Sequence, residues 1–301
     1  MLFKIWLTNI YFMKKEEFPS YLELDLSSAK NFAIKNSIIP SELFKYTKVR
    51  NAKELLYDNI MYLPQLSELN DPFEGSLLCD EGKVEDFYVN SKLDEFMRYI
   101  EEELDGEDYD EDYFKKLGKL FLRFQSQDKL SEIRNVLTDE FYVICLSGRK
   151  DIASLWAHYA DNHRGICIEY DLVNTKNEIF KNLCFPIEYL EDYDLTKDVN
   201  YSFNKKSFNL NLKIKPLLLK AKDWSYEEEW RIIFDDSIFS DFCPYEPYIN
   251  FLKPQKVYMG IDISEKDEKL IKNICKIKEI PLFKAIKDKD KYKFDFDEVD
   301  I

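Results

Sequence analysis

Three charged residues at alternate positions, Glu227, Glu229 and Arg231, lie in the segment KDWSYEEEWRIIF. Read as a strand, the segment places these charges on one face, because side chains alternate along a strand. A carboxylate held near a cation can stabilise positive charge in a transition state. A highly aromatic strand carrying three charges is often near a functional site. The alternatives are a solvated face of ion pairs and, for part of the segment, a helix.

A second polar group lies in NDPFEG, residues 70–75. Asn-Asp-Pro favours a turn, because Asp bonds the backbone two residues on and Pro fixes φ. We expect Phe73 to anchor this turn in the core, so that Asn70, Asp71 and Glu74 project from a fixed loop. The alternative is a well-made loop without a function.

The third stretch, SLWAHYADNHRGICIEYD, contains both histidines of the chain. Trp156 and Tyr159 mark the buried stripe of a helix, and Gly165 is expected to take a positive φ in the turn that follows. Alternation in the next strand separates Glu169 from the face that carries its apolar neighbours. Histidines on packed helices are more often structural than catalytic. The stretch is therefore expected to shape a pocket.

Composition limits the classes of function. The formal net charge is −15, which disfavours non-specific binding of nucleic acid through a basic surface, although a local basic groove stays open. The six cysteines form no CxxC pair and lack zinc spacing with the histidines, so no metal site is predicted. Scattered thiols, no signal peptide and no apolar span of membrane length predict a cytoplasmic protein without a membrane partner.

The periodicities predict an α+β fold, with a central mixed or antiparallel sheet flanked by helices and a helical acidic insertion. We expect one domain over residues 1–301, with its core at about 41–290 and the insertion at about 84–137. Helices are expected at residues 20–38, 51–59, 151–160 and 265–277. Strands are expected at residues 43–49, 60–66, 140–147, 165–171, 227–234, 256–263, 280–288 and 291–299.

Taken in order, these motifs resemble the bacterial family called domain of unknown function 2971. The resemblance covers about residues 41–290 and rests on five motifs. They are the aromatic-Lys-Tyr strand FKYTKV with Lys45, Tyr46 and Thr47, the NDPFEG loop, the Trp-x-x-Tyr helix leading to a Gly-x-x-x-Glu strand, the EEEWR segment and VYMGIDI. The family name implies no activity.

A weaker similarity in layout concerns ADP-ribosyltransferases, which include DNA-modifying toxins. These enzymes place an Arg or His on an early strand to hold NAD, a later aromatic or hydroxyl residue, and a final catalytic Glu. The similarity implies Lys45 or Tyr46 in the first role, Trp156 or Tyr159 in the second, and Glu227 or Glu229 in the last. Lysine at the first position departs from the usual Arg or His.

The resemblance leads to one leading hypothesis, an NAD-using ADP-ribosyltransferase-like toxin or phage-defence effector. In it Glu229 is catalytic, Glu227 orients a protein or nucleic-acid acceptor, and Lys45 or Arg231 meets phosphate. Tyr46, Thr47, Trp156 and Tyr159 would complete the NAD pocket. The alternatives are a non-catalytic module that binds a nucleotide or a protein, and a metal-dependent nucleotide hydrolase using Asp71 and Glu74.

Overall fold

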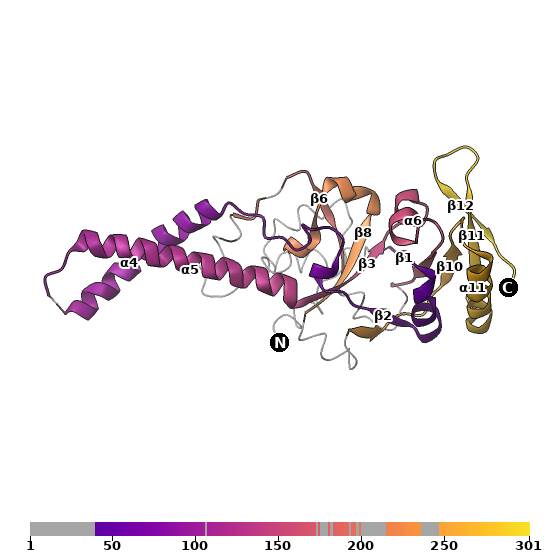
Figure 1. The fold of residues 1–301 in the computed structure, drawn as a ribbon, viewed down its shortest axis with the longest axis horizontal. Coiled ribbons are helices and arrows are strands. Elements are labelled where there is room, and N and C mark those ends of the chain that lie inside the picture. Colours follow the sequence, from indigo (N-terminus) through magenta and orange to yellow (C-terminus); the bar gives the residue numbers. More distant parts are fainter. Residues whose placement is uncertain are drawn as a thin grey trace.

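An eight-stranded sheet forms the centre of the protein, in the order β12-β11-β10-β4-β1-β3-β8-β5 (Figure 1). The computed structural model describes residues 40–301 except 106, 173, 175–179, 181–182, 193, 197–198, 200–214 and 236–246. The strands are β1 (Leu43–Thr47), β3 (Phe141–Ser147), β4 (Ile166–Tyr170), β5 (Cys184–Pro186), β8 (Glu229–Asp235), β10 (Lys256–Met259), β11 (Leu282–Lys287) and β12 (Phe294–Glu298). Two further pairs join β2 (Ile60–Tyr62) to β9 (Tyr248–Asn250) and β6 (Glu188–Leu190) to β7 (Leu219–Ala221).

The sheet is mixed, and the predicted α+β class is confirmed. In the eight-stranded sheet β10 and β11 run parallel, whereas the other neighbouring strands pair antiparallel. The longer helices are α4 (Glu81–Leu104), α5 (Glu111–Asp139), α6 (Ala153–Tyr159) and α11 (Glu265–Lys278). Short helical turns are η2 (Val49–Asn51), η3 (Lys53–Asp58, π-helical), η4 (Leu66–Glu68) and η5 (Lys222–Glu227).

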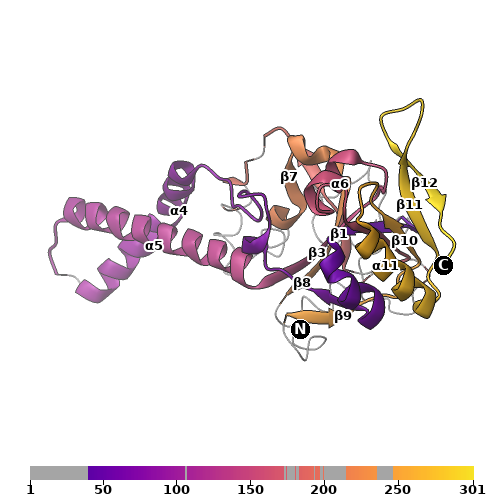
Figure 2. The ribbon, with the colours of Figure 1, turned by 45° about the vertical axis from the view of Figure 1, so that its right-hand side comes forward.

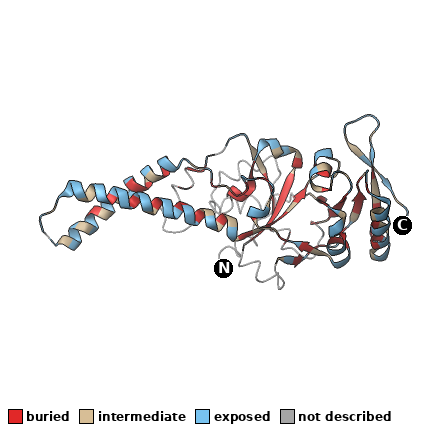
Figure 3. Cartoon of the chain, in the orientation of Figure 1, coloured by how far each residue is buried: buried red, intermediate tan, exposed pale blue. Residues whose placement is uncertain are grey.

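Side chains alternate between two buried clusters along the central strands. Ile166, Ile168 and Tyr170 of β4 belong to the larger cluster, whereas Cys167 between them joins the smaller one. The smaller cluster also holds Trp156 of α6, so that α6 covers this face of β1 and β4. The predicted alternation of this strand is therefore confirmed, and burial follows the strands of the sheet (Figure 3).

A pair of long helices, α4 and α5, projects from one end of the sheet in both ribbon views (Figures 1 and 2). Each helix begins at an aspartate N-cap, Asp80 or Asp110, whose side chain accepts a backbone N–H of the first turn. The predicted acidic run ends α4, forms the connection and begins α5. Where the helices meet, a Cβ at Gly118 would come within 2.6 Å of the Phe96 ring.

Several element predictions differ from the structure in detail. The helix expected at 51–59 is split into η2 and η3. The strand expected at 60–66 ends at Tyr62, two residues before Pro64. The strand expected from Glu227 begins at Glu229, because η5 extends to Glu227. The short strands β5, β6, β7 and β9 were not predicted. The helix expected at 20–38 lies outside the described residues.

The turn between α6 and β4 does not use Gly165 as predicted. Positive φ values fall instead on Asp161, Asn162 and His163, at 50°, 51° and 65°. Gly165 is required for space, because a Cβ there would lie 2.3 Å from the carbonyl oxygen of Thr47. The expectation of a positive φ was therefore wrong, and the reason for glycine is the close approach of β1.

No helix in the described part of the chain is both long enough and apolar enough to cross a membrane.

Replacement of Gly165 by alanine is expected to destabilise the protein, because the new methyl group meets backbone that cannot rotate away. Overpacking of this kind costs about 3 kcal/mol or more, which lowers Tm by about 6 °C or more in a chain of this size. Thermal unfolding followed by circular dichroism measures the change. The matched control is Gly82→Ala, where the nearest atom to the new Cβ lies at 3.5 Å. Equal Tm values for the two variants would contradict the close approach.

Candidate functional site

A cavity of about 290 Å³ opens beside the middle of the sheet. It lies where the ends of β1, β3 and β8 meet the NDPFEG loop and α6. Its polar and charged lining comes from all of these elements and from β7: Lys45, Tyr46, Glu68, Asn70, Glu74, Cys145, Ser147, Tyr159, Lys220, Glu227 and Glu229. The apolar lining is Phe44, Pro64, Leu69, Leu146 and Leu155. A small apolar pocket with converging polar groups is typical of a ligand site.

Arg231 anchors one side of this cavity from within the core. Its guanidinium is fully buried and contacts Glu229 at 2.7 Å and Glu74 at 2.7 Å. Its Nη1 also donates to the carbonyl oxygen of Leu217 at 2.8 Å. The planar guanidinium thus holds two carboxylates that lie 155 positions apart in the sequence (229 − 74). This ion pair fixes the NDPFEG loop to β8.

Lys220 of β7 contacts the two carboxylates that Arg231 binds and also a third carboxylate, that of Glu227. Its ammonium lies 3.2 Å from Glu74, 2.7 Å from Glu227 and 3.0 Å from Glu229. The indole ring of Trp224 covers it, with the ammonium 4.8 Å from the ring centroid. Lys220 is 4% exposed, so the ion cluster formed by Glu74, Lys220, Glu227, Glu229 and Arg231 is desolvated.

The ion cluster carries an excess of negative charge when all its members are ionised, because three carboxylates face two cations (−3 + 2 = −1). The two carboxylates of η5 and β8 respond in opposite directions. Burial alone would raise the pKa of Glu229, but Arg231 and then Lys220 lower it to about 2. Burial raises the pKa of Glu227, and Lys220 only partly opposes this. Glu227 is thus the carboxylate more readily protonated.

Tyr159 links α6 to this cluster. Its hydroxyl donates to Glu227 at 2.6 Å and accepts from the amide nitrogen of Asn70 at 3.0 Å. Burial, followed by the charge of Glu227, raises the pKa of Tyr159. Ser147 adds a further tie, because its hydroxyl donates to the backbone carbonyl of Glu227 at 2.7 Å. The position of Glu227 is therefore fixed at both its side chain and its backbone.

Three neighbouring strands bring a cation, a hydroxyl and a carboxylate to the cavity. Ser147 of β3 pairs with Phe44 of β1 on one side and with Glu229 of β8 on the other. The residue after Phe44 is Lys45, whose ammonium donates to the carbonyl oxygen of Cys145 at 3.1 Å. Lys45 of β1 and Ser147 of β3 therefore line the same cavity as Glu227 and Glu229.

Seven of the predicted site residues line the cavity. They are Lys45, Tyr46, Asn70, Glu74, Tyr159, Glu227 and Glu229. Arg231 lies behind Glu229, with a side chain that is 0% exposed. Thr47 lines a second groove of about 420 Å³, which shares Lys45, Tyr46, Pro64 and Tyr159 with the cavity.

Four predicted residues lie elsewhere. Trp156 packs edge-on to the Tyr46 ring at 5.3 Å and donates to the carbonyl oxygen of Lys150. Glu169 is bound by Lys256 at 2.7 Å and Tyr258 at 2.6 Å. Asp71 accepts the backbone N–H of Phe73, which closes the turn as predicted. Gly165 lies in the turn described above.

Phe73 does not anchor the loop in the core, because its side chain is 59% exposed. The loop is held instead by Glu74, which reaches Arg231 and Lys220. An ion pair thus takes the role that we expected of an aromatic ring.

Sequence reasoning missed four polar residues of the cavity lining, Glu68, Cys145, Ser147 and Lys220, of which the last two make the contacts described above. Lys220 interrupts the apolar run PLLLKA, and a single charge in such a run is a signal for a buried, paired side chain. Ser147 is the last residue of a predicted strand, and its position in the sequence did not indicate its hydrogen bond to Glu227. Among the described residues no group of three or more His, Cys, Asp or Glu is arranged to hold a metal ion.

Comparison with known proteins finds a match to one family model, which names no activity. Residues 155–232 match the model of the family described as "Protein of unknown function (DUF2971)". This match confirms the resemblance seen in the sequence, and it spans four of the five members of the ion cluster. No curated protein and no solved structure matches the chain.

Replacement of Lys220 by methionine is expected to lower the free energy of unfolding by about 3–5 kcal/mol near neutral pH, because it leaves three buried carboxylates with one cation. Urea unfolding measures this loss. The control is Lys222→Met, whose exposed pair with Glu191 contributes about 1 kcal/mol or less.

The loss is also expected to depend on pH. Without Lys220 the pKa of Glu227, which burial already raises, rises further above its value in the unfolded chain. Such a group contributes stability that is present below its unfolded pKa of about 4.3 and is lost as pH rises through its folded pKa. The gap between variant and wild type should therefore narrow as pH falls from 8 to 5. A gap that is constant with pH would show that the lysine acts only through packing.

Proposed function

We propose that this chain, whose residues 155–232 match the model of the DUF2971 family, is an NAD-using enzyme of the ADP-ribosyltransferase type. The observation that carries the proposal is the carboxylate of Glu227, which lines the cavity and is held there by Tyr159 and Lys220. A carboxylate fixed in a desolvated site stabilises positive charge far better than one in water. NAD supplies a reaction in which such charge develops, at the ribose carbon that nicotinamide leaves.

The reaction places charge and proton as follows. The bond between C1′ of the ribose and the nicotinamide nitrogen breaks, and nicotinamide leaves with the bonding electron pair. The cationic ribosyl centre faces Glu227. An acceptor nucleophile then bonds to C1′ and gives its proton to the carboxylate of Glu227, which releases it to water. The raised pKa of Glu227 suits it to accept that proton.

The geometry favours Glu227 over Glu229 as the reacting carboxylate. Glu229 is neutralised by direct contact with both Arg231 and Lys220. Of the two cations Glu227 contacts Lys220 alone, and among the described residues its other side-chain partner is the neutral hydroxyl of Tyr159. In this proposal Glu229 therefore positions Lys220, reversing the roles that the sequence predicted for the two glutamates.

The two adjoining spaces divide NAD between them. The cavity of about 290 Å³ is close to the lower limit of ligand pockets and suits the nicotinamide and its ribose. The second groove, of about 420 Å³, adds Lys48 and Arg50 for the diphosphate. It also holds Tyr62 and Tyr248, whose rings lie 5.5 Å apart and offer an aromatic surface to adenine.

A cellular role follows from the same proposal. Consumption of NAD, or modification of an essential acceptor, would make the protein a toxin or a phage-defence effector that acts in the cytoplasm. The free cysteines among the described residues, Cys79, Cys145, Cys167, Cys184 and Cys275, support a reducing compartment.

A non-catalytic binding module is the second candidate. It is favoured by the completeness of the ion cluster, in which each carboxylate already has a cation within 3.2 Å. In that case the cluster shapes the pocket, and a nucleotide binds without reacting.

Glu227→Gln is expected to lower NAD consumption by about 100-fold or more, because the amide cannot supply the negative charge that the ribosyl centre needs. Release of nicotinamide is measured by chromatography, with and without cell extract as a source of acceptor. The rise of Tm on addition of NAD should persist in the variant, because the contacts to the remainder of the nucleotide are unchanged.

The matched control is Glu228→Gln, which changes the neighbouring glutamate that pairs with Arg149 outside the cavity. It should keep the wild-type rate. A wild-type protein that neither consumes NAD nor gains Tm from it overturns the proposal, whereas a gain of Tm without turnover selects the binding module.

A further inference from the structure

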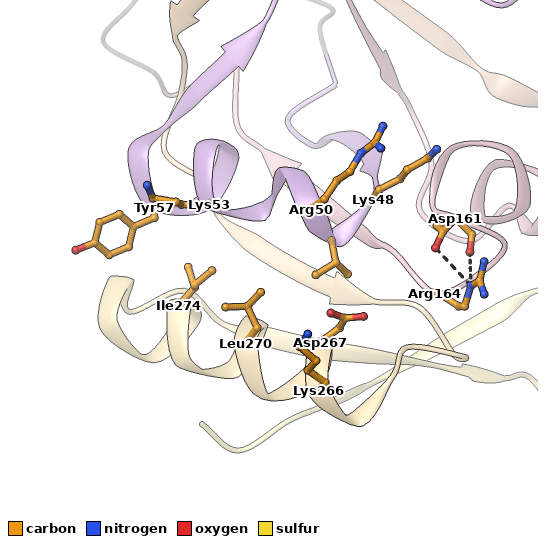
Figure 4. A pocket seen from close by; sticks show the side chains of 11 residues that line it. Lys48, Arg50, Lys53, Tyr57, Asp161, Arg164, Lys266, Asp267, Leu270 and Ile274 are labelled. Carbon is orange, nitrogen blue, oxygen red and sulfur yellow. Dashed lines mark hydrogen bonds and ion pairs between the residues drawn. The ribbon is translucent and has the colours of Figure 1, made fainter.

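A third groove, of about 780 Å³, lies between the short helices η2 and η3 and the first turns of α11 (Figure 4). Five basic residues line it: Lys48, Arg50, Lys53, Arg164 and Lys266. They come from both walls and from the turn after α6, and we call this surface the basic groove. Figure 4 shows Lys48 and Arg50 on the upper wall and Lys266 on α11 below.

The charge of the basic groove opposes that of the whole protein. Two carboxylates, Asp161 and Asp267, also line it, so its formal charge is +3 (5 − 2) in a chain of −15. Arg164 pairs with Asp161 at 3.4 Å. The other four cations make no ion pair with a carboxylate of the described residues. Cations gathered in this way attract an anionic ligand.

The floor of the basic groove is apolar. Val49, Leu270 and Ile274 line it, and Leu270 is 46% exposed. Tyr57 lies at one end, 43% exposed, with the ammonium of Lys278 at 4.5 Å from its ring centroid. A ligand that matches this surface must therefore offer both negative charge and flat apolar faces.

The basic groove adjoins the candidate active site through shared lining residues. Lys48 and Arg50 line both the basic groove and the second groove. The second groove in turn shares Lys45, Tyr46 and Tyr159 with the cavity. A chain-like ligand lying in the basic groove could thus extend toward the cavity past Arg50, Lys48 and Lys45, with Glu54 as the carboxylate of the second groove.

We infer that the basic groove binds single-stranded nucleic acid, with phosphates on its lysines and arginines and bases against Val49, Leu270 and Tyr57. Unpaired bases expose the faces that stack on apolar and aromatic side chains, whereas a duplex hides them. The acidic remainder of the surface also disfavours the wide contact that a duplex needs. The idea that the bound strand accepts ADP-ribose rests on the proposed function. The binding of the strand itself does not depend on that function.

The test uses a fluorescein-labelled single-stranded 12-nucleotide DNA and the RNA of the same sequence, with binding followed by anisotropy. The variant replaces the three exposed basic residues of one wall together: Lys48→Ala, Arg50→Ala and Lys53→Ala. Affinity is expected to fall about 10-fold or more. The slope of log K against log salt concentration should become shallower by about 2, since each lost phosphate contact changes it by about 0.7.

The matched control removes three exposed basic residues of α5: Lys116→Ala, Lys119→Ala and Arg123→Ala. It lowers the net charge by the same amount and should bind within about twofold of wild type. A second variant, Leu270→Gln, should weaken binding with no change of slope, because it alters the apolar floor alone.

Three results would overturn the inference: no salt-dependent binding by the wild type, equal losses in the two triple variants, or equal competition by a mononucleotide. The rise of Tm with NAD is measured on the wild type, because Lys48 and Arg50 also line the groove proposed for the diphosphate of NAD. This measurement separates the inference from the proposed function. Oligonucleotide binding without NAD turnover supports the inference about the basic groove and contradicts the proposed enzyme. NAD turnover without oligonucleotide binding supports the proposed enzyme and contradicts the inference.

Discussion

The ion cluster around Arg231 and Lys220 is the constraint on which the remainder of the site depends. Burying charges costs several kcal/mol for each ion, and only close, well-formed pairs offset that cost. The cluster meets this condition because Arg231 lies 2.7 Å from both Glu229 and Glu74. Once formed, it cannot lose one partner without leaving another charge uncompensated. Its main effect is therefore to select a single arrangement of the elements that carry these residues. Its contribution to the free energy of unfolding is the smaller effect.

That arrangement joins parts of the chain that the sheet alone would leave independent. Glu74 belongs to a loop outside the eight-stranded sheet, Lys220 to the separate β6–β7 pair, and Arg231 to β8. The hydroxyl of Tyr159 adds α6 through Glu227. These four elements meet at polar and charged groups, and the pairing of these groups holds their side chains at the cavity wall. Apolar side chains in the same positions would have filled the cavity.

The strands and helices followed from the sequence because their signals are local. Alternation in β4 and the charge pattern of β8 are both visible within about ten residues. The partners of the charges were not visible, because the pairing of Glu74 with Arg231 across 157 positions depends on topology. The sequence thus identified Glu229 and Arg231 but not Lys220. Phe73 and Gly165 were misread for the same reason: an ion pair holds the loop, and the approach of Thr47 requires the glycine.

The electrostatic field around this protein differs between its surface as a whole and its grooves. The acidic residues dominate the total, whereas basic residues gather along one path from Lys45 through Lys48 and Arg50 to Lys266. Field lines from a low-dielectric groove are focused toward its opening, so that this path is felt by anions despite the net charge of −15. At its inner end the sign changes, because the ion cluster carries one more carboxylate than cations. An anionic ligand drawn along the path would therefore reach the cavity with its phosphates on the basic side and its developing positive charge on the acidic side.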